Sequence, residues 1–199
     1  MTADIVLLTG DIFEHNRLNA TILERTRDVL AAARLPVVML PGNHDPLMRG
    51  SVWDRGALSS IDNVHVLGEE SNLATFTAFD LEIWGRAHED YNEINPLEGA
   101  PKRTARRQIV AGHGHFAEER TPAGKPGPGW LFTPEDIDAT DADYVALGHW
   151  NRKVQVGGGD VPAWYSGSPD YAETVNVIRL TSSNKVEISH SPVEGPPEI

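Results

Sequence analysis

Four short apolar runs recur along the chain, each with the length and the β-branched content of a buried parallel strand. They span residues 5–9, 37–40, 108–111 and 144–147. Each run is followed, directly or after one proline, by a glycine and then by Asp, Asn or His. Between the first two runs, residues 19–35 show the apolar spacing of an amphipathic helix, which Pro36 ends. Strand, helix and strand in this order predict a parallel βαβ unit.

The remaining pattern predicts shorter elements. Residues 51–60 predict a short helix with Trp53 packed inward, and Thr133-Pro134 begins another helix with a capping threonine and an early proline. Alternation of apolar and polar residues predicts strands, of which the first three form an antiparallel stretch and the next two a hairpin. These strands span residues 63–67, 73–79, 81–84, 154–156, 161–165, 175–180 and 186–190. No internal linker divides the chain, so we predict a single domain over residues 1–199 with an extended tail from about residue 191.

The polar residues at the four strand ends are the candidate site. In an open α/β sheet, ligands gather at the carboxyl ends of strands. A single polar turn or a lone histidine is usually structural. The same pattern at four strand ends, a glycine followed by Asp, Asn or His, is much less expected by chance and indicates a site. The residues concerned are Asp11, Asn43, His44, Asp45, His113, His115 and His149. Carboxylate, amide oxygen and imidazole together suit a borderline divalent ion such as zinc, manganese or iron.

The charge and composition of the chain argue against nucleic acid and membranes as partners. The net charge is −12, whereas proteins that grip nucleic acid non-specifically present a basic face. The basic cluster, Lys102-Arg103 with Arg106-Arg107, is predicted on a short helix and is interpreted as a solvated face. A long polynucleotide is therefore not the expected substrate. There is no cysteine, no signal peptide pattern and no apolar run of membrane-spanning length, so we expect a cytoplasmic protein without a membrane partner.

These motifs, in order, resemble those of the calcineurin-like metallophosphoesterases. The matching residues are Gly10-Asp11, Gly42-Asn43-His44-Asp45, His113 and Gly148-His149. The segment from Asp143 to His149, followed by Tyr165-Ser166-Gly167-Ser168-Pro169, is similar to the SbcD-type nuclease subunits and their smaller relatives. The resemblance runs from about Asp4 to about Tyr171. It implies an α/β fold of two facing mixed β-sheets flanked by helices, shortened at its N-terminal side.

The resemblance also implies roles for individual residues. Asp11, Asn43, His113 and His149 would hold a metal ion, and His44 would face the phosphate and assist the leaving oxygen. Asp45 would orient the His44 ring. His115 stays open as an alternative ligand or a proton shuttle. A divalent ion held by such ligands, with manganese favoured over zinc or iron, would activate water for attack on a phosphate ester.

Two departures from the family pattern change the expectation. The family's opening Asp-x-His motif has no counterpart in this sequence, and Asn151 stands where the last histidine of Gly-His-x-His belongs. The second ion of the family would keep Asp11 as a ligand but lose the others, so we predict one metal ion per chain. The strand that carries the opening motif lies beside the Gly10-Asp11 strand in the family. We therefore predict a homodimer or higher homo-oligomer that covers this edge.

The expected function is hydrolysis of small phosphate diesters by a metal-activated water. Three alternatives stay open: a phosphomonoesterase, a nuclease of the same superfamily, and a non-catalytic interaction module on a degenerate phosphoesterase fold.

Overall fold

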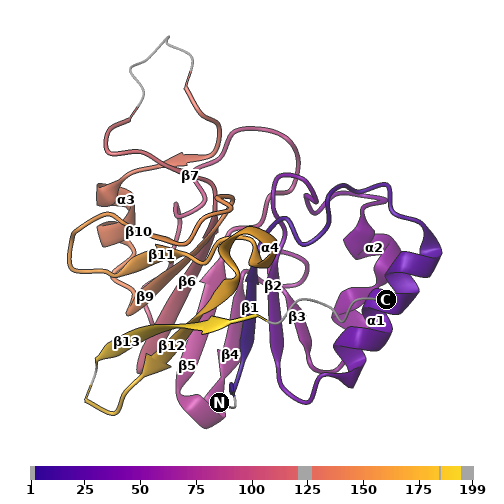
Figure 1. Ribbon diagram of the computed structural model, residues 1–199, viewed down its shortest axis with the longest axis horizontal. Helices are drawn as coiled ribbons and strands as arrows, with labels where there is room; N and C mark the ends of the chain where they lie inside the picture. The colour runs from indigo at the N-terminus through magenta and orange to yellow at the C-terminus, as the bar shows by residue number, and fades with distance from the viewer. Residues whose placement is uncertain (1–2, 121–126, 184, 194–199) are drawn as a thin grey trace.

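Two facing β-sheets form the centre of the computed structural model, which describes residues 3–120, 127–183 and 185–193 (Figure 1). The first sheet contains β1 (Val6–Thr9), β2 (Val37–Leu40) and β3 (Val64–Val66), all parallel and in that order. The second sheet has the order β10-β11-β9-β6-β5-β4. Its strands are β4 (Leu73–Phe76), β5 (Leu81–Gly85), β6 (Arg107–His113), β9 (Tyr144–Gly148), β10 (Val154–Val156) and β11 (Ala163–Tyr165). β1 and β2 lie against β6 and β9, as a two-sheet sandwich requires.

Helices and short strands surround this sandwich. α1 (Ala20–Ala32) and α2 (Val52–Gly56) cover the outer face of the first sheet (Figure 1). A hairpin of β12 (Thr174–Leu180) and β13 (Val186–Pro192) crosses in front of the strands in the same view. The remaining elements are two 3-10 turns (Leu58–Ser60 and Thr77–Phe79), β7 (His115–Phe116), β8 (Leu131–Phe132), α3 (Pro134–Ala139) and α4 (Pro169–Ala172).

Strand β2 shows why the apolar runs are continuous rather than alternating. Val37 and Met39 pack on one face with α1 and α2, and Val38 and Leu40 pack on the other face between the sheets. All four side chains are buried, which is the normal environment of a central parallel strand. The βαβ unit predicted from the sequence is present, since β1 and β2 are parallel and α1 connects them.

Helix ends follow local capping chemistry. The Asn19 side chain accepts a hydrogen bond from the Ile22 backbone N–H at 3.0 Å and begins α1. α1 ends at Ala32, before the predicted residue 35, and the Asn63 amide then donates to the Leu30, Ala33 and Leu35 carbonyl oxygens. The helix predicted over residues 51–60 is interrupted at Ala57, which has left-handed backbone angles. Trp53 packs inward as predicted.

Three expectations about strands and loops need correction. β3 does not join the antiparallel stretch; it pairs in parallel with β2, because Val64 and Val66 pack into the core beneath α1 and α2. The basic cluster is not helical: Arg103 and Arg107 both bind the Asp143 carboxylate, and Arg107 begins β6. The last strand is longer than predicted, because β13 pairs with β12 as far as Pro192 rather than ending at His190. Residues 194–199, where the rest of the predicted tail falls, lie outside the described residues.

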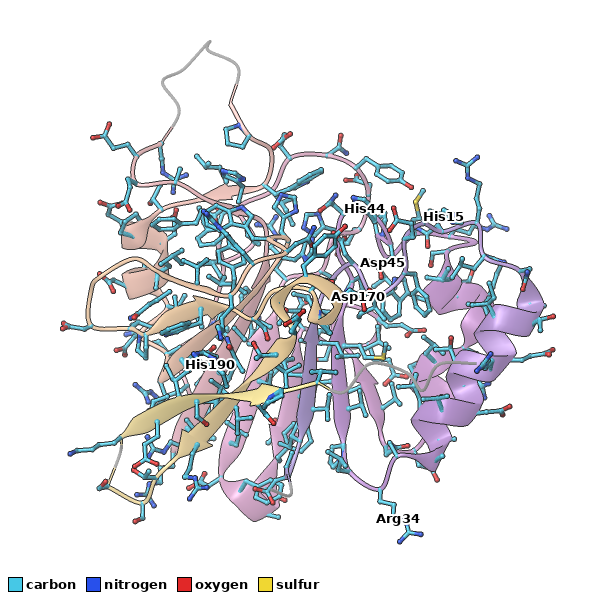
Figure 2. All side chains as sticks on the ribbon, in the orientation of Figure 1. His15, Arg34, His44, Asp45, Asp170 and His190 are labelled. Carbon is cyan, nitrogen blue, oxygen red and sulfur yellow. The ribbon has the colours of Figure 1, made fainter. Side chains whose placement is uncertain are left out.

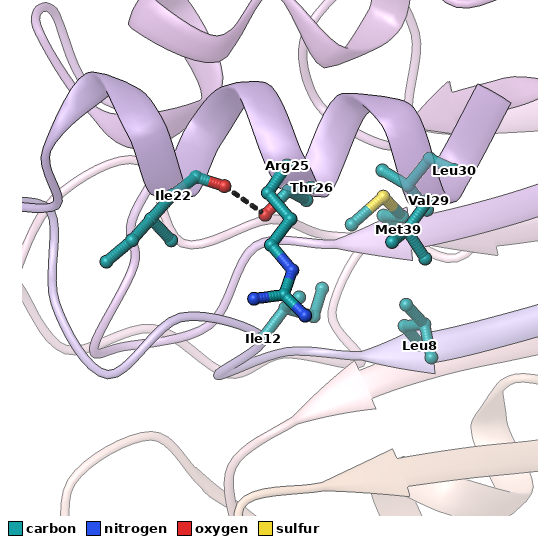
Figure 3. Close-up of a pocket in the computed structure, with 8 residues that line it drawn as sticks. All are labelled: Leu8, Ile12, Ile22, Arg25, Thr26, Val29, Leu30 and Met39. Atoms are coloured by element: carbon teal, nitrogen blue, oxygen red, sulfur yellow. Dashed lines mark hydrogen bonds between the residues drawn. The ribbon is translucent and has the colours of Figure 1, made fainter. Parts of the chain in front are cut away.

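One edge of β1 is open. Within the described residues, β1 pairs with β2 and no strand pairs with its other edge. Beside it, an apolar groove of about 400 Å³ runs between α1 and the strands (Figure 3). Its lining residues are Leu8, Ile12, Ile22, Arg25, Thr26, Val29, Leu30 and Met39. Ile22 is 44% exposed and Val29 is 65% exposed, so this face of α1 is only partly packed.

No helix among the described residues combines the length and apolarity needed to cross a membrane.

Candidate metal centre

The carboxyl ends of four parallel strands bring the candidate ligands together. β1, β2, β6 and β9 end near the same point, so Asp11, Asn43, His113 and His149 converge although they are far apart in the sequence. One ligand atom each from Asp11, His113 and His149 lies within 4.8 Å of the others, which is close enough for a single ion to contact all three. Asn43 lies among them, since its Oδ1 is 3.0 Å from His113 Nε2 and 3.1 Å from His149 Nδ1.

The protonation of His113 identifies the chemistry of the cluster. Its Nδ1 is 2.7 Å from the Thr9 carbonyl oxygen, and because a carbonyl can only accept, Nδ1 carries the proton. A neutral ring then has a lone pair on Nε2, which faces Asn43 Oδ1 at 3.0 Å and Asp11 Oδ2 at 3.1 Å. Three acceptor atoms at this distance need a proton or a cation between them. A backbone carbonyl behind the imidazole is also the usual support for a metal-ligating histidine. The residues present therefore fit a divalent ion.

Close packing explains why glycine precedes these ligands. A Cβ on Gly10 would lie 2.1 Å from His113 Nδ1, and a Cβ on Gly148 would lie 1.7 Å from the Thr9 carbonyl oxygen. The residues that follow these glycines have unusual backbone angles, with φ of 50° at Asp11 and 103° at His149. Left-handed angles at non-glycine residues cost energy and concentrate at functional sites. The glycine-led pattern is thus a consequence of how tightly the strand ends converge.

Electrostatics place these side chains in their metal-binding forms near neutral pH. Burial raises the pKa of Asp11, but the hydrogen bonds that its carboxylate makes, among them the one from the His44 backbone N–H, outweigh burial, and the pKa falls to about 2. Burial lowers the pKa of His149 to about 4. A carboxylate anion and a neutral imidazole are the forms that bind metal ions.

The structure corrects the role of Asp45. Its carboxylate does not contact the His44 ring; it accepts hydrogen bonds from the backbone N–H groups of Gly42, Ile12 and Phe13 at 2.7, 3.0 and 3.1 Å. Asp45 is fully buried, and burial raises its pKa to about 6 although these N–H groups favour the anion. Because these N–H groups belong to the loops that follow β1 and β2, Asp45 ties the two loops together.

His44 is positioned by a residue that sequence reasoning missed. Its Nδ1 donates to the Glu14 carbonyl oxygen at 3.2 Å, and the Glu14 carboxylate lies 3.8 Å away. The His44 backbone N–H donates to Asp11 Oδ1 at 2.9 Å, whereas its side chain is 47% exposed. Nε2 therefore stays free to meet an incoming group. Figure 2 shows His44 and Asp45 near each other in the loop region at the upper ends of the strands. Nothing in the sequence marks Glu14, because its backbone forms the contact.

Comparison with known proteins decides the family. A sequence model described as calcineurin-like phosphoesterase matches residues 1–153. The chain belongs to the calcineurin-like phosphoesterase family. Membership supports a phosphoric ester hydrolase that uses divalent metal ions. No curated protein matches the chain.

Solved structures support the phosphoesterase fold. The protein TT1561 of Thermus thermophilus is 14% identical, with a TM-score of 0.58 over 94% of this chain and 86% of that one. A Staphylococcus aureus protein designated a 5′-nucleotidase, solved with α-ketoglutarate, is 16% identical with a TM-score of 0.56. That match covers 87% of this chain and 41% of the Staphylococcus aureus chain. At these identities the similarity shows the fold alone.

Other histidines of this phosphoesterase lie outside the ligand cluster. His65, predicted to be structural, is exposed on β3 and packs against Phe76. His88, also predicted to be structural, is buried behind the site, with Nε2 2.8 Å from the His113 carbonyl oxygen. Burial lowers the pKa of His88 to about 4, so it stays neutral near pH 7.

His115, like His113, lies next to His149. The ring centroids of His115 and His149 are 6.1 Å apart, and His115 Nδ1 accepts a hydrogen bond from Trp150 Nε1 at 3.2 Å. Asn151 is exposed beside the site rather than among the four donors. Sequence reasoning missed Trp130, whose ring centroid is 6.0 Å from that of His149, because no glycine-led pattern precedes it.

Proposed function

We propose that this calcineurin-like phosphoesterase is a metal-dependent phosphodiesterase for small substrates, with manganese as the favoured ion. The observation that carries the proposal is the convergence of Asp11, Asn43, His113 and His149 with the proton of His113 directed at Thr9. A divalent ion bound by these side chains would supply an activated water and polarise a phosphoryl oxygen.

The chain's own residues supply the rest. His113 and His149 present neutral nitrogens, and Asp11 provides the anionic oxygen. His44, with Nδ1 held by the Glu14 carbonyl oxygen, directs its other nitrogen outward to donate a proton to the leaving oxygen or to stabilise charge on the phosphoryl group. The backbone N–H of His44 holds Asp11 in place, so the catalytic group and the ligand are fixed by the same residue.

A diester is favoured over a monoester because of charge. A phosphate monoester brings two negative charges to the reacting group at neutral pH, whereas a diester brings one. Within the described residues, no Arg or Lys bonds the side chains of the four proposed ligands, and Arg152 and Lys153 line the hollow beside His149 rather than the ligand cluster. We propose one ion per chain, since Asn151 is a weak ligand and lies outside the donor cluster. A cysteine-free sequence is compatible with the cytoplasm, and that location stays a prediction.

The test compares bis(p-nitrophenyl) phosphate with p-nitrophenyl phosphate, using chelator-treated protein before and after addition of manganese. We expect manganese-dependent turnover with a higher kcat/KM for the diester. His149→Ala is the matched variant, because it removes one ligand from a partly exposed position. A higher kcat/KM for the monoester would instead establish a phosphomonoesterase. Absence of metal-dependent turnover with both esters would leave a non-catalytic module and refute the proposal.

A further inference from the structure

A hollow of about 710 Å³ opens beside the candidate metal centre and includes His149 in its wall. The loop that follows β9 supplies Trp150, Arg152 and Lys153, and Tyr171 of α4 closes another side. Tyr171 is 77% exposed, so its ring is available to a bound molecule. The hollow is continuous with the site through His149, and a substrate at the centre would extend into it.

Arg152 and Lys153 are adjacent cations that line the hollow without a carboxylate partner among the described residues, unlike the paired arginines of the chain. Arg86, Arg103, Arg107 and Arg120 each pair with a carboxylate. Neither Arg152 nor Lys153 forms an ion pair or a side-chain hydrogen bond with any residue that the structure describes. Asp170 and Glu173 lie close in sequence to Tyr171 and Ala172, which line the hollow. Neither carboxylate forms an ion pair with Arg152 or Lys153. Two adjacent cations that have no carboxylate partner in the described part of the structure therefore line the hollow in a chain of net charge −12.

The guanidinium group of Arg152 is held in place by aromatic packing. Its central carbon lies 4.8 Å from the centroid of the Trp150 ring, a cation–π contact that leaves the N–H donors of the guanidinium available. The Trp150 ring is itself fixed, because it stacks on Tyr165 with centroids 4.6 Å apart and rings inclined by 14°. Its Nε1–H also donates to His115 at 3.2 Å. A guanidinium fixed in this way loses little entropy when it binds an anion.

We propose that this hollow binds a second phosphate group of the substrate, so that the preferred substrates are small phosphodiesters that carry a further, terminal phosphate. The inference rests on the proposed phosphodiesterase function. Arg152 offers the planar fork of donors that matches phosphate oxygens, and Lys153 adds a compact charge next to it. Tyr171 offers a flat surface for a ring that joins the two phosphates. A nucleoside 5′-phosphodiester that also carries a 3′-phosphate is one example of such a molecule.

The kinetic test uses two chromogenic esters that differ by one phosphate. They are the 5′-p-nitrophenyl ester of thymidine 5′-phosphate and the same ester with an added 3′-phosphate. A charge-assisted hydrogen bond contributes about tenfold to a hundredfold in affinity, so wild-type kcat/KM is expected to favour the 3′-phosphorylated ester by that factor. Arg152→Gln is expected to reduce this ratio about tenfold, and Lys153→Gln to reduce it less.

Arg34→Gln is the matched control. Arg34 is exposed at the far end of the molecule from His44 (Figure 2), so its loss changes net charge equally but leaves the ratio unchanged. A wild-type ratio near one, or a ratio that Arg152→Gln and Lys153→Gln do not change, would overturn the proposal. An equal reduction by Arg34→Gln would also overturn it, because the effect would then be one of overall charge.

A binding measurement separates this inference from the proposed function. Calorimetry compares thymidine 3′,5′-bisphosphate with thymidine 5′-phosphate as ligands of the manganese-loaded protein. We expect tighter binding of the bisphosphate in wild type and loss of that difference in Arg152→Gln. If neither ester is hydrolysed but this difference is found, the phosphodiesterase function fails and the phosphate site stands. Equal affinities in wild type would refute the phosphate site whatever the activity.

Discussion

Replacing His44 by alanine separates a catalytic role from a metal-binding role. The contact of His44 with the proposed ligands runs through its backbone N–H, which bonds Asp11 Oδ1 at 2.9 Å and is kept in His44→Ala. The lost ring is half-exposed and bonds only the Glu14 carbonyl oxygen, so unfolding free energy should change by less than about 1 kcal/mol. Metal content should therefore stay near that of wild type.

Turnover should fall much further than stability. General acid–base groups contribute on the order of a hundredfold to ten-thousandfold, which corresponds to about 3 to 5 kcal/mol of activation free energy. The assay compares diesters with p-nitrophenyl and phenyl leaving groups, and measures bound manganese by elemental analysis. Turnover of the phenyl ester should fall more than turnover of the p-nitrophenyl ester, because phenolate is the poorer leaving group and its departure depends more on protonation. Loss of manganese in step with activity, or equal losses for both esters, would refute the assignment.

Three further predictions follow from the strand ends. Asp45→Ala leaves the backbone N–H groups of Gly42, Ile12 and Phe13 without their acceptor. The free energy of unfolding measured in urea should therefore fall by about 3 kcal/mol or more. A fall of less than about 1 kcal/mol would contradict the role of Asp45. Gly148→Ala should abolish manganese binding, because its Cβ would lie 1.7 Å from the Thr9 carbonyl oxygen; a variant that binds manganese normally would show that the strand ends are looser than described. We also propose that the open edge of β1 pairs with β1 of a second copy across a two-fold axis. Light scattering at micromolar concentration should then give the molar mass of a dimer, and the molar mass of a monomer would refute the proposal.

The sequence was sufficient to predict the parts of the site that local chemistry determines. Each apolar run becomes a strand, and Asp11, Asn43, His113 and His149 meet because parallel strands end at one edge. The capped start of α3 was also predicted, since Thr133 bonds Asp136, only three positions away. In both cases the determining contacts are either local or imposed by strand direction.

Contacts between distant segments were not predictable from local pattern. Arg103 and Arg107 pair with Asp143, which is distant in the sequence, and the basic segment is not helical although its composition favoured a helix. The partner of Asp45 is the backbone of the β1 loop, and the partner of His44 is the Glu14 carbonyl oxygen. Backbone groups carry no sequence signal, so such partners appear only when the fold is known.

The most direct test of the central claim is a titration of chelator-treated protein with manganese, followed by turnover of bis(p-nitrophenyl) phosphate. If Asp11, Asn43, His113 and His149 hold a single ion that turnover requires, activity should rise from background and reach its plateau at one manganese ion per chain. His149→Ala should shift this curve to much higher manganese concentrations. Full turnover without added metal, or a plateau at two ions per chain, would contradict the account.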